Sequence, residues 1–315
     1  MQRVIIIQPM NPPTSAAGLN GIAALPHLGV IRAQGEQAQA FLQGQLTQDV
    51  ALAPPGAARL AGWCNPKGRL VASFIACKRS PQEFWLVCSG DLLAATLKKL
   101  SLFVLRAKVR LTDASGELAL HGLIGGACAE AAASAQGQDA AAFLAALPPA
   151  DGAPRALWIA PAGSAAPPGP ALPAALWDWA AVRSGVARIT QPVAGAFVPQ
   201  MLNYESAGGV DFSKGCYPGQ EVVARSQFHG AIKRRAFVGQ VDGPARAGQE
   251  VFAPAGDADQ PVGLIAQAAA AGAGGTAVIA SLQLAAAEAG GLRVGAPDGP
   301  PLAELHLPYP LREDI

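Results

Sequence analysis

The sequence predicts an α+β fold, in which helices and antiparallel strands follow one another without the regular alternation of a doubly wound sheet. Between residues 28 and 112 we expect a strand, a helix, three strands, a helix and a strand, in that order. After residue 235 we expect only short strands separated by turns. This order favours mixed α+β layers followed by a small antiparallel barrel or sandwich.

Length and composition bound the class of protein. The 315 residues are enough for two or three domains. Hydrophobic residues make up 51% of the chain and charged residues 14%, which is the opposite of the bias that keeps a chain disordered. The formal net charge of +1 lacks the basic excess of a protein that coats nucleic acid.

The cysteines and histidines do not predict a metal site. The five cysteines are odd in number and none belongs to a Cys-x-x-Cys pair, so neither a disulfide framework nor a sequence-contiguous zinc or iron–sulfur site is expected. The four histidines are scattered. Free thiols fit a reducing compartment, and we expect a cytoplasmic protein.

Two apolar stretches are candidates for a targeting or membrane segment. Residues 4–7 are too short for the core of a signal peptide. Residues 263–287 carry no charge and are long enough to span a bilayer, but the glycines at 272–275 interrupt them. Two strands around a glycine turn are therefore expected there, and no membrane association.

The first half of the chain contains most of the expected helices. Prolines and small residues over 1–17 predict a flexible leader. Apolar runs predict strands at 28–33, 60–63, 70–78, 84–88 and 109–112. Helical spacing or alanine-rich composition predicts helices at 36–46, 92–100, 128–150 and 174–184. The polar residues Cys64 to Arg69 predict a hairpin between the second and third strands.

The second half is richer in turns. Residues 163–173 are rich in proline and glycine and read as a linker, and residues 186–235 as an irregular, glycine-punctuated segment. The strands expected after it lie at 236–241, 250–252, 263–267, 276–282, 293–294 and 303–306. We expect these strands to form the barrel.

The densest chemical signal is Lys-Gly-Cys-Tyr-Pro-Gly-Gln-Glu at 214–221. Glycines on both sides of Cys216 allow a ligand to approach the main chain, and Lys214 would favour the reactive thiolate. Gln220 and Glu221 carry groups that can pair with the nitrogens of a flat heterocycle. The alternative is a tight turn around a buried, inert cysteine.

With its flanking residues at 197–203 and 230–235, this octapeptide resembles the YgfZ family. Two further blocks agree, Phe-Leu-Gln-Gly-Gln-Leu-Thr-Gln-Asp at 41–49 and Pro-Lys-Gly-Arg at 66–69, and the three occur in the family's order. The resemblance implies a fold like that of the glycine-cleavage T-protein, with interleaved α+β lobes over 18–235 around a central cavity. A C-terminal barrel over 236–315 completes it.

The resemblance also implies tetrahydrofolate in the cavity and a role as an accessory factor for iron–sulfur enzymes, including tRNA methylthiolation enzymes. Two tryptophans contribute to the family's folate site. One position falls on Trp177, whose indole could stack on the pterin or benzoyl ring, or could simply be a core residue of its helix. The other falls on Leu28, so the sequence departs from the pattern there.

A second departure concerns the chemistry. T-proteins carry an acidic pair after the glycine of the hairpin, and the matching positions here are Ala72 and Ser73. Neither side chain can act as a carboxylate base, which argues against aminomethyl transfer. The candidate reactive thiol is then Cys216, expected to face the folate cavity, with Lys214, Tyr217 and Glu221 beside it.

Basic residues follow the octapeptide and form the last candidate site: Arg225, His229, Lys233, Arg234 and Arg235. This cluster is either a solvated face or a landing site for the glutamate tail of folate or for a charged partner such as tRNA. Three classes of function therefore stay open: a folate-binding accessory protein, a folate-dependent transferase or demethylase, and a scaffold with an empty cavity.

Overall fold

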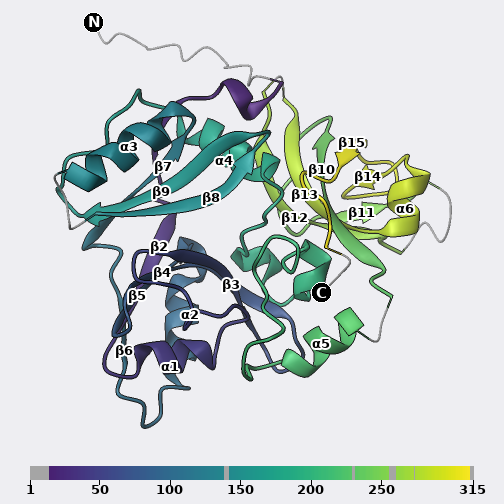
Figure 1. The fold of residues 1–315 in the computed structure, drawn as a ribbon. Coiled ribbons are helices and arrows are strands. Elements are labelled where there is room, and N and C mark those ends of the chain that lie inside the picture. Colours follow the sequence, from purple (N-terminus) through teal and green to yellow (C-terminus); the bar gives the residue numbers. More distant parts are fainter. Residues whose placement is uncertain (1–13, 138–141, 229–230, 255–259, 273, 313–315) are drawn as a thin grey trace, which may run out of the picture.

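A computed structural model describes residues 14–137, 142–228, 231–254, 260–272 and 274–312. The leader predicted over 1–17 therefore lies mostly outside the described residues, as does His229. The described chain forms three antiparallel sheets, of four, five and six strands. In Figure 1 the first two lie one above the other and the third lies beside them. The fold is of the predicted α+β class.

The four-stranded lobe contains strands from two separate parts of the chain. Its order is β1(Gly21–Ala24), β7(Leu118–Ile124), β9(Ala153–Pro161) and β8(Phe143–Ala150). Helix α3(Gly126–Gly137) covers one face, where Ala131 packs on Trp158 and Ala160. The opposite face belongs to the central core.

The five-stranded lobe is inserted between β1 and β7. Its order is β3(Ala58–Cys64), β4(Leu70–Ser80), β5(Glu83–Ser89), β2(Leu28–Gln34) and β6(Arg110–Asp113). Successive side chains of a strand point to opposite faces, and β2 shows the result. Ile31 and Ala33 pack under α1(Ala38–Gln43) and α2(Gly90–Ser101), whereas Leu28 and Val30 face the central core.

The central core is where the lobes and the C-terminal sheet meet. It contains residues of both lobes, of α4(Ala174–Arg183) and of the C-terminal sheet. After α4 the chain runs through two short 3-10 helices, η2(Gln191–Val193) and η3(Pro199–Leu202), to α5(Gln220–Phe228). The predicted irregular segment is thus correct for most of its length, but it misses α5.

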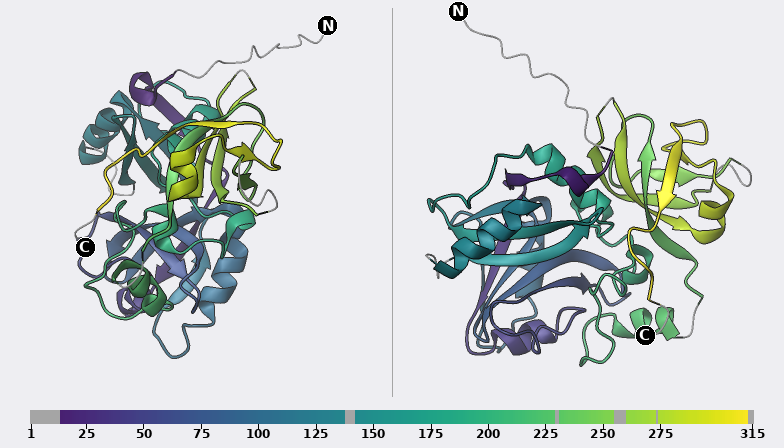
Figure 2. Two further views of the ribbon diagram at one scale, coloured as in Figure 1. Left: turned by 90° about the vertical axis from the view of Figure 1, so that its right-hand side faces the viewer. Right: turned by 45° about the horizontal axis from the view of Figure 1, so that its top comes forward.

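The C-terminal sheet curls into half a barrel (Figure 2). Its order is β14(Arg293–Val294), β11(Glu250–Phe252), β12(Gly263–Ala270), β13(Thr276–Gln283), β10(Arg234–Val241) and β15(Leu302–His306), and α6(Leu284–Ala289) follows β13. The uncharged stretch forms mainly β12 and β13, as predicted. Among the described helices, none is long and apolar enough to cross a membrane.

The alanine-rich helix predicted over 128–150 is wrong in its second half. Helix α3 ends at Gly137, and Phe143–Ala150 is the edge strand β8, paired with β9. Pro148 and Pro149 remove two backbone donors, which a strand tolerates only at a sheet edge or bulge. The pairing shifts register between Leu147 and Ala150. The helix predicted at 36–46 is shorter, and strands β1, β7 and β9 were not predicted.

Candidate functional site

A cavity of about 80 Å³ lies between the two lobes. Its walls are mainly apolar and include Leu28 of β2, Leu157 of β9 and Trp177 of α4. The two residues that the sequence predicted for the folate site, Leu28 and Trp177, therefore do line one cavity. We call it the central cavity.

The indole of Trp177 is covered by the chain's own groups. A side chain at Gly122 would meet three indole carbons at 2.5–2.7 Å, so the indole lies flat on the backbone of β7. The guanidinium of Arg155 lies over the ring, 4.4 Å from its centroid. Trp177 is 2% exposed. The indole is thus a core residue as well as part of the cavity wall.

Two arginines line the central cavity, and the sequence did not single out either. Arg155 is 6% exposed, and among the described residues its one hydrogen bond goes to the carbonyl of Pro148 at 3.3 Å. The Nε atoms of Arg155 and Arg188 are buried without a partner. In the described residues no carboxylate oxygen lies within 4.0 Å of either guanidinium, although the charges of Asp178 and Asp91 raise the pKa of Arg188 against the effect of burial. Burial lowers the pKa of Arg155 to about 9, and the positive charge of Arg188 acts in the same direction.

The positions that replace the T-protein acidic pair lie on opposite faces of β4. Ser73 lines the central cavity, and its hydroxyl accepts a hydrogen bond from the backbone N–H of Ile189 at 2.8 Å. Ala72 is fully buried under α1 and α2. Neither position brings a carboxylate to the cavity.

A second, outer cavity of about 320 Å³ lies between α4 and the C-terminal sheet. Arg188 and Gln267 line both cavities and so form the boundary between them. Arg246 and Asp178 line only the outer cavity. Asp178 lies 3.4 Å from the imidazole of His27.

The octapeptide loop is anchored by Lys214. This side chain is 7% exposed, and its Nζ donates hydrogen bonds to the carbonyls of Gln43, the last residue of α1, and of Leu46. A lysine at the C-terminal end of a helix satisfies carbonyls that the helix leaves free. Burial lowers its pKa to about 8, against the opposing effect of Asp49 and Asp211. Lys214 therefore ties the loop to the five-stranded lobe.

Cys216 is exposed, and it does not line the central cavity. The expectation that its thiol faces that cavity is not met. Lys214 and Tyr217 are buried, and Gly215 and Cys216 between them are exposed. Tyr217 is 7% exposed, and burial raises its pKa. The alternative of a buried, inert cysteine does not hold either. Buried Cys64, by contrast, has a pKa raised to about 12.

The three sequence blocks meet around this loop. A side chain at Gly219 would come within 2.4 Å of the carbonyl oxygen of Asn65 in the hairpin, so the two backbones touch. Thr47 donates a hydrogen bond to the carbonyl of Gly209 at 2.6 Å. Gln48 donates one to the carbonyl of Gly208 at 2.5 Å. Each block therefore contributes to the placement of Cys216.

Helix α5 does not reach the central cavity. Gln220, Glu221 and Arg225, predicted as folate contacts, are not among its lining residues, and Glu221 and Arg225 are exposed. The basic cluster is also divided. Lys233 is exposed, whereas Arg235 is buried.

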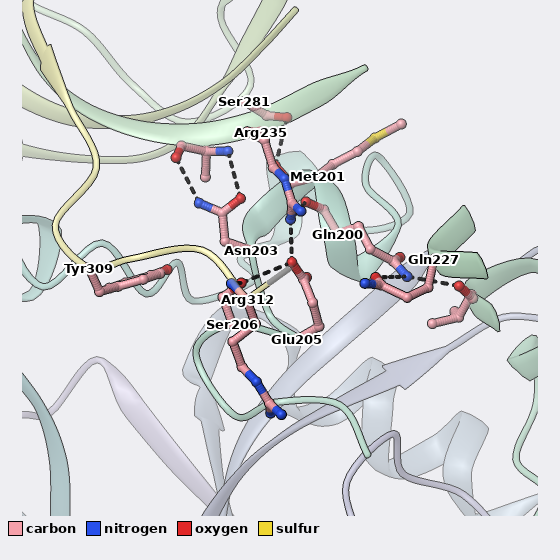
Figure 3. A network of polar contacts seen from close by, with 12 residues as sticks. Gln200, Met201, Asn203, Glu205, Ser206, Gln227, Arg235, Ser281, Tyr309 and Arg312 are labelled. Carbon is pink, nitrogen blue, oxygen red and sulfur yellow. Dashed lines mark hydrogen bonds and ion pairs between the residues drawn. The ribbon is translucent and has the colours of Figure 1, made fainter. Parts of the chain in front are cut away.

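Arg235 belongs to a buried polar network that the sequence did not predict (Figure 3). Its guanidinium pairs with Glu205, which is completely buried. Asn203 bonds the backbone of Ala236 in β10 with both ends of its amide. Ser206 accepts a hydrogen bond from the backbone N–H of Arg312 at 3.0 Å. The network fastens the segment before the octapeptide to the C-terminal sheet and to the end of the described chain.

Proteins of known family resemble this chain in sequence and in fold. Residues 17–150 match the family described as the GCVT N-terminal domain. The glycine cleavage system aminomethyltransferase T from Bartonella henselae superposes with a TM-score of 0.62 at 15% identity, over 86% of this chain and 80% of that one. The fold is therefore that of a GcvT-like protein.

Sequence comparison is more specific. The tRNA-modifying protein YgfZ of Edwardsiella ictaluri is 31% identical over 233 residues, 66% of this chain and 67% of the relative. That of Klebsiella pneumoniae is 28% identical over 271 residues, 79% of this chain and 81% of the relative. The chain belongs to the YgfZ family.

Proposed function

We propose that this protein is a folate-binding accessory factor that supports iron–sulfur enzymes of tRNA modification in the cytoplasm. Membership of a family of tRNA-modifying proteins supports the tRNA context. The observation that carries the folate part is the central cavity between the two lobes, with its apolar walls, its indole and two arginines whose Nε atoms have no partner in the described residues. The absence of carboxylates at positions 72 and 73 argues against aminomethyl transfer.

The residues present suit a folate. The apolar walls can hold an aromatic ring, and Arg155, Arg188 and Arg246 can hold its carbonyl and carboxylate oxygens. A bound reduced folate supplies a carrier for one-carbon units. The central cavity is smaller than the roughly 300 Å³ at which small-molecule pockets begin, so binding requires the wall to move. The outer cavity provides room for the tail beyond Arg188.

Cys216 is the group that we propose for contact with a partner protein. Its exposure and its fixed position on the octapeptide loop present the thiol outward. Exposed Val222 and Phe228 on the neighbouring helix α5 add an apolar surface beside it. The thiol and the folate would then serve different molecules on different faces of the protein.

Filling the central cavity tests folate binding. Ala181 lies in the cavity wall on α4, and Ala181→Leu is expected to weaken tetrahydrofolate binding at least tenfold in calorimetric titration. Ala174→Leu, at the exposed start of the same helix, should leave the affinity unchanged. If the wild-type protein shows no saturable binding, the protein is a scaffold with a closed cavity.

Replacing Cys216 tests the role of the thiol. In a bacterial strain without its own YgfZ protein, Cys216→Ser is expected to restore neither iron–sulfur enzyme activity nor tRNA methylthiolation. Cys128→Ser is the matched control, because Cys128 is only partly exposed and lies on α3 in the other lobe. Full restoration by folded Cys216→Ser would show that the thiol is dispensable.

A further inference from the structure

The arginine and glutamine side chains of the central cavity offer a ligand hydrogen-bond donors. Arg155 and Arg188 can only donate. The side-chain carbonyl of Gln267 already accepts from the backbone N–H of Arg188 at 2.8 Å, which leaves its amide N–H groups free to donate. Ser184 offers no free donor, because its hydroxyl already donates to the carbonyl of Ala181 at 2.7 Å. A ligand that satisfies this cavity must supply oxygen acceptors.

The guanidinium of Arg155 is also costly as it stands. A buried charge without a partner destabilises a folded protein. Arg155 keeps its charge at 94% burial with one weak hydrogen bond, and its neighbour Arg188 repels it. The charges of Asp178 and Asp91 favour the charged form of Arg188 from beyond 4.0 Å, whereas an anionic or carbonyl-bearing ligand would place acceptors within hydrogen-bond distance of both guanidiniums. Stacking on Trp177 holds the Arg155 fork in one plane, which suits bidentate contact with oxygens.

We propose that Arg155 is the ligand-binding residue of the central cavity and that Arg155 and Arg188 select a ligand by its carbonyl or carboxylate oxygens. This inference rests on the proposed folate function and changes which side chain contacts the folate. The ligand meets the guanidinium that covers Trp177, and the indole acts as a platform for Arg155. Specificity then comes from oxygen acceptors on the ligand. Aminomethyl transfer of the T-protein kind would instead need carboxylates on the protein.

The test compares Arg155→Met with the wild-type full-length protein. Methionine keeps an unbranched apolar side chain beside Trp177 but removes the charge, the donors and the guanidinium that lies on the indole. Calorimetric titration with tetrahydrofolate is expected to show at least a tenfold loss of affinity. The midpoint of thermal unfolding should stay the same or rise, because an uncompensated buried charge is gone. Arg155→Lys keeps the charge without the planar fork and should lose affinity too. Arg225→Met, at an exposed arginine on α5, is the control.

Two fragments identify the oxygens. If Arg155 binds the ring carbonyl, Arg155→Met weakens the binding of tetrahydropterin; if it binds the tail, it weakens that of p-aminobenzoylglutamate. The inference is overturned if Arg155→Met binds tetrahydrofolate with unchanged affinity. It is also overturned if Arg155→Met and Arg155→Lys both unfold at a lower temperature than the wild type. Either outcome leaves the proposed function standing. A wild-type protein that binds none of the three probes overturns both.

Discussion

Glu205→Ala is expected to lower the free energy of unfolding by about 3–5 kcal/mol, the loss typical of breaking a buried ion pair from one side. Glu205 is completely buried and Arg235 is 7% exposed, so the substitution leaves a guanidinium in the protein interior without its counter-charge. The remaining acceptor for Arg235 is the carbonyl of Gln200, at 3.3 Å. Urea denaturation with linear extrapolation measures the change.

An exposed ion pair provides the comparison. Lys108 and Glu36 lie 2.8 Å apart with more than 70% of each side chain exposed, and Glu36→Ala should cost no more than about 1 kcal/mol. Removing both buried charges, as Glu205→Leu with Arg235→Met, should restore most of the stability that the single variant loses. A loss below about 1 kcal/mol in Glu205→Ala would mean that water reaches Arg235.

The strands and their pairing partners differ in how well the sequence predicts them. The strands of the five-stranded lobe follow from apolar runs bounded by turn residues, and β11 and β14 have the predicted bounds. Phe143–Ala150 shows the limit. Its alanines favour a helix locally, whereas pairing with β9, a long-range contact, makes it a strand. Strand β1 is only four residues long, and its pairing with distant β7 cannot be read from local pattern.

Residues of the candidate site could be predicted where they belong to a family motif. Residues that only the fold brings to the site could not. Leu28 and Trp177 were identified from the resemblance, and both line the central cavity. Arg155 lies in an apolar run with no motif around it, so only the pairing of β9 reveals it. The direction of Cys216 could not be inferred either, because it depends on the contact between Lys214 and the end of α1.

Gly219→Ala is expected to displace the octapeptide loop. Gly219 has φ +80°, and an alanine there costs roughly 1–2 kcal/mol in backbone conformation. Its methyl group would also lie 2.4 Å from the carbonyl oxygen of Asn65 and 2.7 Å from the backbone of Gly68. These are backbone atoms of the hairpin and cannot turn aside as a flexible side chain would. We therefore expect the loop and the hairpin to separate.

Gly163→Ala isolates the contact from the backbone effect. Gly163 has φ +85°, and a side chain there would meet nothing within 4 Å. Gly163→Ala should therefore lose only the stability that the backbone conformation costs. Gly219→Ala should have a free energy of unfolding lower by a further amount of roughly 1–3 kcal/mol, because its methyl group is also overpacked. Tyr217 lies near buried Cys64, whose charge would act on the pKa of the phenol. Displacing Tyr217 should therefore open Cys64 to maleimide under native conditions, in Gly219→Ala alone. Equal stability and equal labelling of the two variants would mean that the hairpin does not hold the loop, and Lys214 alone would then position Cys216.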